Sequence, residues 1–250
     1  MARRLTAEFL GTAMLVTVVV GSGIAAQRLS PHDVGLQLLE NSLATAFGLT
    51  VLILMLGPIS GGHFNPVVSA ADWTLSAVAG KGAGMPGREV LPYCAAQIAG
   101  AVAGAELANL MYGVPVGQLA TTERTGAPLL LGEVVATAGL IALIFALVRT
   151  GRVALAAPAV GAYIGAAYWF TSSTSFANPA VTIGRIFSDS FAGIAPSSAP
   201  GFIAAQLVGG AVAVLLVLWF FPEPSTPADP AVDEVVVPHT TSAETGSGPR

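Results

Sequence analysis

Charged residues and cysteine are scarce in this chain. Only 10% of its 250 residues are Asp, Glu, Lys or Arg, whereas a typical soluble domain has about a quarter. So few charges cannot cover a folded surface in water, which excludes an ordinary soluble globular protein. The single cysteine, Cys94, lies within an apolar run. It excludes an intrachain disulfide and favours a small packing residue.

The chain also lacks the residue patterns of common catalytic centres. No set of His, Asp and Glu, or of Cys and His, has the spacing of a metal site or an activated nucleophile. The formal charge of −4 owes much to acids after Phe221 and gives no indication of nucleic-acid binding. We therefore expect neither an enzyme nor a bound cofactor.

Hydrophobic residues, by contrast, make up 54% of the chain and gather in long runs. Runs of about 20 residues are long enough for a helix to cross a hydrocarbon core of roughly 30 Å. The sequence therefore predicts an all-α membrane protein with six transmembrane helices. The predicted spans are Leu5–Gln27, Leu36–Gly57, Val90–Tyr112, Pro128–Val148, Val153–Thr174 and Ala199–Phe221.

The first run could also be a signal peptide, because Arg3 and Arg4 precede it. Three features favour a retained span instead. Glu8 interrupts the apolar region, the run is too long, and a similar pattern recurs at Glu133, where no cleavage could occur.

The basic residues suggest an orientation, because they accumulate in cytoplasmic loops. Both termini are expected on the cytoplasmic side of the cell membrane, within a membrane domain of residues 1–223. Residues 224–250 are rich in Pro, Ser, Thr and acids and are predicted to form a disordered cytoplasmic tail. The basic residues expected inside are Arg3, Arg4, Lys81, Arg88, Arg149 and Arg152, and those outside are Arg28, Arg124 and Arg185.

Three landmarks of the first half, about residues 5–113, recur in the second half, about 128–221. The segment "EFLGTAML" is matched by "EVVATAGL", "QIAG" is matched by "QLVG", and an Asn-Pro lies between the landmarks of each half. Each half has three spans, an odd number, so the second must insert upside down relative to the first. The pattern predicts an inverted repeat.

The two Asn-Pro pairs, at Asn65 and Asn178, are expected to begin helices. Asn is a favoured N-cap, and Pro fits the first helical position. Helices from Asn65 to about Ala77 and from Asn178 to about Ser190 would each span about half a bilayer. They would be re-entrant and meet near the midplane, with the preceding loops enclosed by protein or lining water. Ordinary loops with capped interfacial helices are the alternative.

The motifs "AEFLGTAML", "SGGHFNPVVS" and "FANPAV" in two inverted halves resemble the major intrinsic protein family of aquaporins and aquaglyceroporins. The resemblance covers roughly Leu5 to Phe221. It implies a right-handed bundle of six helices and two half-helices, with a pore in each subunit of a homotetramer. Val67, Val181 and "STSFANPAV" further resemble bacterial aquaglyceroporins associated with arsenic resistance, whose solutes include neutral arsenite.

In such a channel the two motifs form the centre of the pore. The half-helix N-termini make a positive region that opposes cations and protons, and the two Asn amides donate to a passing oxygen. Val67 stands where the family usually has Ala and is expected to adjust packing. The predicted motif residues are Asn65, Pro66, Val67, Asn178, Pro179 and Ala180.

Three polar residues are predicted to support the loops. Glu8 and Glu133 could relay protons, but their symmetric placement favours hydrogen bonds to the two re-entrant loops. His63 could be a pH-sensitive gate, although a histidine satisfied within its own loop is the favoured interpretation.

The residue after the second motif, Val181, replaces the arginine that most of the family has in its filter. Spacing from each Asn gives Thr45, Ala166 and Ser175 as its partners. Local similarity would favour Phe47 over Thr45, but helical register places Phe47 about 200° around the helix. Such a filter is small, neutral and wide.

Arg185 lies four residues beyond Val181, on the same helix face. It could restore positive charge at the outer mouth, or it could pair with Asp189. The sequence leaves these alternatives open.

These features predict a passive channel for small uncharged solutes, such as glycerol-like polyols, neutral arsenite and water. Arsenite at neutral pH is an uncharged triol near glycerol in shape, so the sequence does not choose between them. The alternative is an ion-coupled secondary transporter, because inverted repeats with broken helices also occur there. It would need an intramembrane charged site, which only the two symmetric glutamates could supply.

Overall fold

The computed structural model describes residues 1–79 and 84–222, and these residues form helices joined by loops. Within these described residues, six helices are long and apolar enough to cross a membrane, which confirms the predicted helical fold. The predicted tail, residues 224–250, lies outside the described residues. The spanning helices are α1 (Ala2–Leu29), α2 (Val34–Ser60), α4 (Gly87–Met111), α5 (Ala127–Arg149), α6 (Ala156–Phe170, after the 3-10 turn η1, Val153–Leu155) and α8 (Ala199–Phe220).

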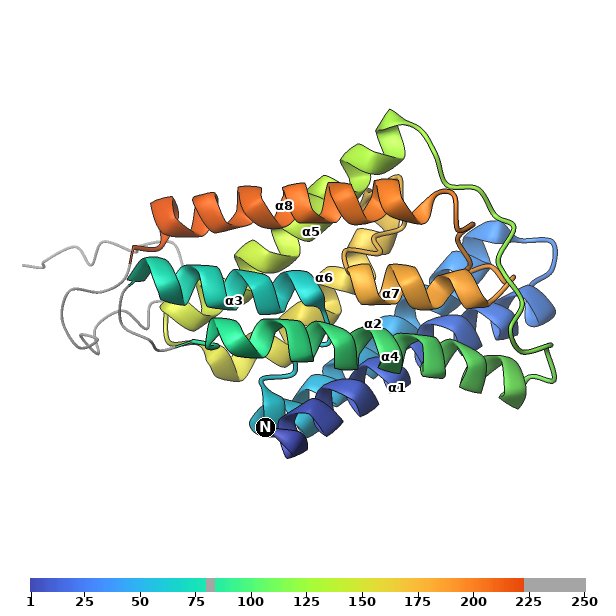
Figure 1. Cartoon of the computed structure of the whole chain (residues 1–250). Helices are drawn as coiled ribbons and strands as arrows, with labels where there is room; N and C mark the ends of the chain where they lie inside the picture. The colour runs from blue at the N-terminus through green and yellow to red at the C-terminus, as the bar shows by residue number, and fades with distance from the viewer. Residues whose placement is uncertain (80–83, 223–250) are drawn as a thin grey trace, which may run out of the picture.

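Two shorter helices begin at the Asn-Pro pairs. Helix α3 covers Pro66–Ala79, and α7 covers Pro179–Gly184 before a 3-10 turn, η2 (Arg185–Phe187). Figure 1 shows α3 and α7 end to end, running away from each other from the middle of the molecule. The second half-helix is shorter than predicted because the chain becomes extended at Ser188 (φ −146°, ψ 115°) and turns back.

The fifth span is also shorter than predicted. Helix α6 ends at Phe170, and Thr171 takes an extended conformation (φ −102°, ψ 141°). The residues from Thr171 to Asn178 form the re-entrant loop that leads into α7. An apolar composition alone does not mark this boundary, because the loop is also enclosed by protein.

The two halves pack through equivalent glycines. A Cβ added at Gly100 of α4 would overlap the carbonyl oxygen of Phe9 in α1, and one at Gly209 of α8 would overlap that of Val134 in α5. Each glycine lies three residues after the landmark glutamine of its half. The glycines let the helix backbones approach closely, which is how small residues act in membrane helix pairs.

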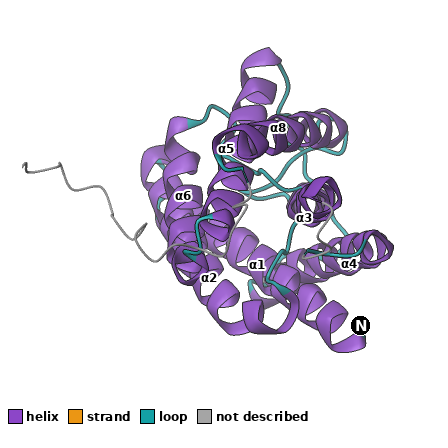
Figure 2. Ribbon diagram, turned by 90° about the vertical axis from the view of Figure 1, so that its left-hand side faces the viewer, coloured by secondary structure: helices purple, strands orange, loops and turns teal. Residues whose placement is uncertain are grey.

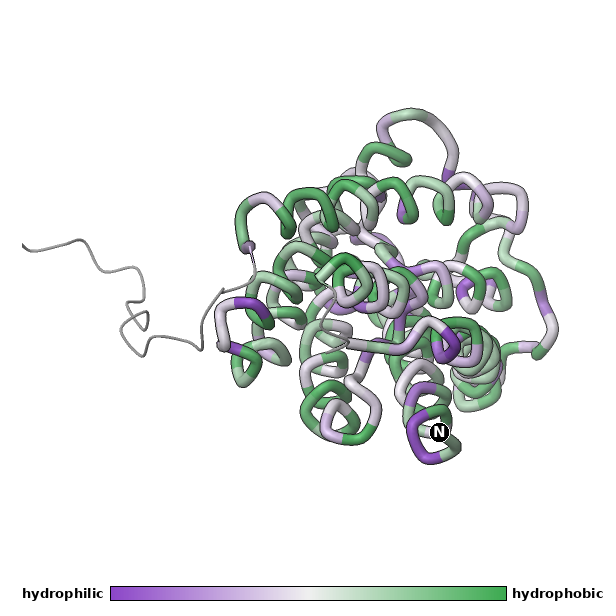
Figure 3. The backbone as a smooth tube through the Cα atoms, turned by 60° about the vertical axis from the view of Figure 1, so that its left-hand side comes forward, coloured by the Kyte–Doolittle hydropathy of each residue, from purple (hydrophilic) through white to green (hydrophobic). Residues whose placement is uncertain are grey.

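Each half-helix packs between two spanning helices. Figure 2, viewed toward the ends of the helices, shows α3 between α4 and α8, and α3 contacts both. Helix α7 likewise contacts α4 and α8. Hydrophobic residues follow the lengths of the helices in Figure 3, and large apolar side chains such as Leu91 and Trp219 are exposed on the outside. This outer surface suits a hydrocarbon solvent.

Candidate functional site: a pore between two re-entrant loops

Glu8 of α1 holds the loop that precedes α3. Its Oε1 accepts hydrogen bonds from Ser60 Oγ (2.6 Å) and the His63 backbone N–H (3.0 Å). Its Oε2 accepts from the Phe64 N–H (2.8 Å) and Gln97 Nε2 (2.7 Å). The carboxylate is fully buried, so it is stabilised by these donors rather than by water.

Glu133 of α5 holds the second loop in the same way. It accepts from the N–H groups of Phe176 (2.9 Å) and Ala177 (2.9 Å) and from Gln206 Nε2 (2.6 Å). These donors occupy the positions that correspond by repeat to those around Glu8. Both glutamates thus contact the re-entrant loops, as their symmetric placement suggests, and neither lines the cavity described below.

The loops carry strained backbone where these carboxylates bind. Phe64 and Ala177, each directly before a motif Asn, both have φ near +48°, a conformation that costs a residue with a side chain of order 1–3 kcal/mol. Thr174 (φ 62°) and Ser175 (φ 51°) share it in the second loop. The hydrogen bonds to the buried carboxylates offset this cost.

Asn178 caps α7, and Asn65 makes the corresponding bond at α3. Asn178 Oδ1 accepts from the N–H groups of Ala180 (3.0 Å) and Val181 (3.2 Å), while Asn65 Oδ1 accepts from that of Val67 (2.9 Å). Pro66 and Pro179 are the first residues of the two helices. The Val67 side chain lies against Gly210 of α8 and does not line the cavity.

The side-chain amide of each motif Asn also donates a hydrogen bond to the other half of the protein. Asn65 Nδ2 donates to the Ala177 carbonyl (2.8 Å), and Asn178 Nδ2 donates to the Phe64 carbonyl (2.7 Å). An amide NH₂ has two donors, so each Asn keeps a second N–H. Both Asn residues line the cavity, where that N–H can meet a solute oxygen.

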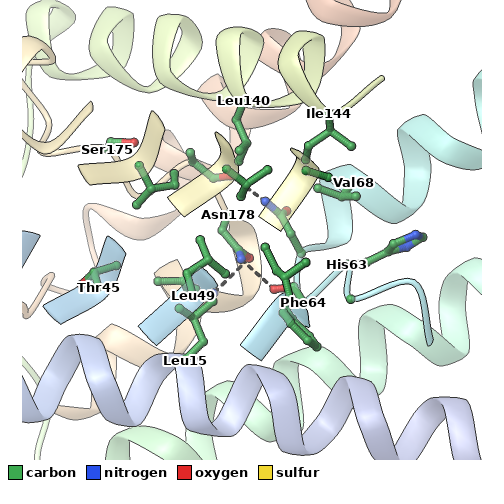
Figure 4. Close-up of a pocket in the computed structure, with 18 of the residues that line it drawn as sticks. Leu15, Thr45, Leu49, His63, Phe64, Val68, Leu140, Ile144, Ser175 and Asn178 are labelled. Carbon is green, nitrogen blue, oxygen red and sulfur yellow. Dashed lines mark hydrogen bonds between the residues drawn. The ribbon is translucent and has the colours of Figure 1, made fainter. Parts of the chain in front are cut away.

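A cavity of about 290 Å³ runs past these residues. Apolar side chains from α1, α2, α5 and α6 form much of its wall, including Leu15, Leu49, Leu140 and Ile164. In Figure 4, Thr45 and Ser175 lie to one side of Asn178, and His63 lies to the other. The cavity is therefore an apolar passage with polar residues toward both ends.

Three of the four predicted filter residues line this cavity: Thr45, Ser175 and Val181. Thr45 is buried, whereas Phe47 is 69% exposed on the outside of α2, so helical register predicted the correct face. The Ser175 hydroxyl is buried without a hydrogen-bond partner among the described residues. It is free to bind a solute hydroxyl.

Ala166 does not line the cavity, which corrects its predicted position. It is exposed on the outer face of α6, and Val160, Ile164 and Tyr168 face the cavity at intervals of one helical turn. The prediction counted back from Asn178 through a loop that is not helical, so the register did not carry over. Tyr168 lines the cavity there, with its hydroxyl 3.2 Å from Thr45 Oγ1.

Arg185 is 2% exposed and lines the cavity one turn beyond Val181. Its Nε donates to the Ala192 carbonyl, and its guanidinium carbon lies 3.3 Å from the centre of the Phe176 ring. Within residues 1–79 and 84–222 its terminal nitrogens have no acceptor, and it does not pair with Asp189. Asp189 accepts instead from the N–H (2.9 Å) and Oγ1 (3.0 Å) of Thr121.

A second arginine, Arg124, lies behind Phe176. It donates to the carbonyls of Gly193 (2.9 Å) and Phe191 (3.0 Å), and its guanidinium is 5.2 Å from the same ring. Burial lowers its pKa from the ordinary value, yet a guanidinium stays protonated at neutral pH. Two cations therefore flank one aromatic ring at this end of the pore.

His63 and Asp72 line the opposite end of the cavity. His63 Nδ1 lies 3.0 Å from Ser69 Oγ, and its Nε2 lies 3.7 Å from Asp72 Oδ2. The sequence prediction included His63 but missed Asp72, Tyr168 and Arg124. A charged residue on a half-helix was the available signal for Asp72.

The sequence matches the family model described as "Major intrinsic protein" over residues 1–175. The chain belongs to this family. Aquaglyceroporin AqpS of Rhizobium meliloti (strain 1021) is 46% identical over 227 residues, which are 91% of this chain and 93% of that protein. Membership confirms a multi-pass membrane protein and the predicted passive channel for small uncharged solutes.

Shorter matches and one solved structure agree with this assignment. The propanediol uptake facilitator PduF of Citrobacter freundii is 36% identical over 43% of this chain and 36% of its own length. Aquaporin Z of Brucella melitensis biotype 1 is 41% identical over 43% of each. The structure of the aquaglyceroporin from Plasmodium falciparum superposes with a TM-score of 0.65 at 20% identity, covering 86% of this chain and 95% of that one, which shows the shared fold.

Proposed function

We propose that this channel conducts glycerol-sized polyhydroxy solutes, including neutral arsenite, together with water. The observation that carries the proposal is Val181 in the wall of the cavity, with Arg185 held one turn away against Phe176 and the Ala192 carbonyl. The narrow part of the pore is thus not filled by a long charged side chain. The similarity to a protein named aquaglyceroporin over nearly the whole chain supports the same solute class.

The polar groups at the Arg185 end suit a solute with several hydroxyls. Thr45 and Tyr168 present a pair of hydroxyls, and the buried Ser175 hydroxyl has no partner among the described residues. The terminal nitrogens of Arg185 are donors without a protein acceptor there. A polyol can give and accept several hydrogen bonds at once, which replaces those that it loses on leaving water.

The apolar wall suits the other side of such a solute. Leu15, Leu49, Leu140 and Ile144 lie beside the polar track of the loops (Figure 4). A polyol in this passage can turn its carbon chain toward these residues and its hydroxyls toward the loops. Urea and water fit the same track without using the apolar wall.

The arrangement of the whole protein follows from the same assignment. We propose a homotetramer in the cell membrane with both termini in the cytoplasm, on the strength of the family resemblance and the distribution of basic residues. Residues 1–223 are the channel domain, with halves of about 5–113 and 128–221, and residues 224–250 are a cytoplasmic tail.

Solute flux through purified protein in liposomes tests this function. Vesicles that contain the channel should admit glycerol and arsenite rapidly, and in an impermeant osmolyte they should shrink rapidly as water leaves. Entry should rise in proportion to the gradient and should be unaffected by an uncoupler. Saturating entry that collapses with the uncoupler would favour the transporter alternative, and water flux without glycerol flux would contradict the proposed solute class.

A further inference from the structure

The two half-helices carry opposite charges at equivalent positions. Asp72 is the seventh residue after Asn65, and Arg185 is the seventh after Asn178. Both line the same cavity. Because α3 and α7 run in opposite directions from the pore centre (Figure 1), the two side chains lie toward opposite ends. We name these ends the Asp72 mouth and the Arg185 mouth.

Asp72 is fixed in place and keeps access to the passage. Its Oδ2 accepts a hydrogen bond from the Met85 N–H (3.1 Å), and Gly84 packs so closely that an added Cβ would lie 2.6 Å from Oδ1. The side chain is nevertheless 25% exposed. The carboxylate therefore has a defined position at the edge of the cavity.

No fixed cation neutralises Asp72 in the described part of the chain. Arg4 pairs with Glu89. The His63 imidazole, at 3.7 Å from Asp72 Oδ2, is too far for a direct hydrogen bond. A neutral imidazole also leaves the negative charge uncompensated. The Asp72 carboxylate is thus the acidic group that lines this mouth within the described residues.

The rest of the pore is neutral or positive. The N-termini of α3 and α7 face the centre, each carrying about half a positive charge, and Arg185 lies at the other mouth with Arg124 behind it. Glu8 and Glu133 are behind the loops, and their oxygens accept loop hydrogen bonds. This distribution repels cations, but by the same physics it attracts anions.

Asp72 is the only acidic residue among the described residues that line the cavity. We propose that Asp72 is a specificity-determining residue that excludes small anions at the Asp72 mouth, the cytoplasmic one in the proposed orientation. A neutral hydroxyl can donate a hydrogen bond to the carboxylate, whereas a monovalent anion meets repulsion. This inference rests on the proposed channel function and deepens it: opposite charges at the two mouths together select neutral solutes.

The test replaces Asp72 by Asn in the full-length protein in liposomes. Asp72→Asn removes the charge and keeps an oxygen that accepts from Met85. Nitrate efflux driven by an imposed membrane potential should rise about tenfold, which corresponds to roughly 1.4 kcal/mol. Glycerol flux should remain measurable, because the Asn oxygen can still accept a hydrogen bond from a solute hydroxyl, and nitrate efflux is therefore compared with glycerol flux in the same vesicles.

Two matched variants separate the site from net charge. Asp189→Asn removes an equal charge from a carboxylate that accepts from Thr121 outside the cavity, and nitrate efflux should remain at the parent level. Asp72→Glu keeps the charge, so its nitrate efflux should also remain at the parent level. If Asp72→Asn does not reach the vesicles, Asp72→Ser provides the same measurement with a smaller neutral side chain.

The outcomes distinguish this inference from the proposed function. Parent-level nitrate efflux in a neutral Asp72 variant that still passes glycerol would overturn the role of Asp72 and leave the channel intact. An equal rise in nitrate efflux in Asp189→Asn would overturn it as well, because the effect would then follow net charge. A parent that passes no glycerol would overturn the proposed function first, and this inference with it.

Discussion

Val181 lines the cavity with Thr45 and Ser175, and in the proposed function its small side chain leaves the pore wide. Val181→Arg would place a long cation there, one turn from Arg185 on the same face. We expect glycerol flux to fall at least about tenfold and water flux to fall much less, since water is the smaller solute. Stopped-flow vesicle assays would measure both fluxes.

Val181→Leu is the control for this substitution, because it adds volume without charge. The amount of each variant in the vesicles must match the parent, since a misfolded protein imitates selectivity. A well-inserted Val181→Arg protein with the parent ratio of glycerol to water flux would show that Val181 is not in the constriction.

The Arg185 guanidinium lies over the Phe176 ring and lines the cavity, so we propose that it contributes positive charge to its mouth. Arg185→Ala should increase the leakage of K⁺, by about tenfold if the charge contributes roughly 1.4 kcal/mol to the barrier. Glycerol should still pass. Potential-driven K⁺ flux provides the measurement, and Arg185→Lys, which keeps the charge, should leak less than the alanine variant. Identical K⁺ flux in all three proteins would leave Arg185 with a structural role only.

Among single residues, the sequence predicted Val181 directly, because α7 joins it to the landmark Asn178. Thr45 also lines the cavity, although the loop of residues 61–64 separates α2 from Asn65. Ala166 was placed by counting from Asn178 across Thr171 to Ala177, a loop whose residues include three with positive φ. Counting residues predicts a facing direction only where every residue has the same backbone conformation. The backbone conformation changes from residue to residue in this loop. Tyr168 became identifiable only once the end of α6 was known.

The conformation of each re-entrant loop depends on the buried carboxylate that accepts hydrogen bonds from its backbone. Glu133→Gln would turn one acceptor oxygen into a donor that faces either the Phe176 N–H or the pair formed by the Ala177 N–H and Gln206. The free energy of unfolding should fall by about 1–3 kcal/mol, the typical cost of an unsatisfied buried group. Thermal unfolding in detergent measures this loss, and exposed Glu123→Gln serves as the control. Equal melting temperatures for the two variants would argue against the loop-holding role.

Helix α8 offers an internal comparison between two glycines. Gly209→Ala places a Cβ against the Val134 carbonyl of α5, whereas Gly201→Ala meets only the end of the Leu130 side chain at 3.4 Å. We expect Gly209→Ala to destabilise the protein strongly and Gly201→Ala to be neutral or stabilising by up to about 1 kcal/mol, from helix propensity. Melting temperatures of the purified variants would show the difference. A smaller loss for Gly209→Ala than for Gly201→Ala would mean that the α5 and α8 backbones are not in close contact.

The lengths of the elements were predicted less well than their number. Hydrophobicity located the six spans, and Asn-Pro located the starts of α3 and α7. The end of α7 depends on Arg185 and on the chain that returns over it, where the Ile194 N–H donates to the Arg185 carbonyl at 3.3 Å. That contact joins residues nine positions apart in sequence, and no local sequence pattern predicts it.

For the whole molecule, the inverted repeat was the strongest prediction because it used several landmarks in a fixed order. The structure places those landmarks in matching contacts, with each glutamate bound to the glutamine of its own half. The family model matches residues 1–175 and so ends before the second motif. The hydrogen bonds of Asn178 are therefore known from the structure and not from the family match. The proposed tetramer stays a prediction, because the structure describes a single chain.

The crossed amides at the pore centre have a consequence for how the protein is made. Asn65 needs the Ala177 carbonyl, and Asn178 needs the Phe64 carbonyl. During synthesis, the first re-entrant loop therefore lacks these two hydrogen bonds until Ala177 and Asn178 have been made and inserted. A gene cut between Val116 and Gly117 should yield two fragments that conduct nothing when made alone and recover glycerol flux when made together. Neither half can complete the hydrogen bonds of its own motif Asn until the other half is in place.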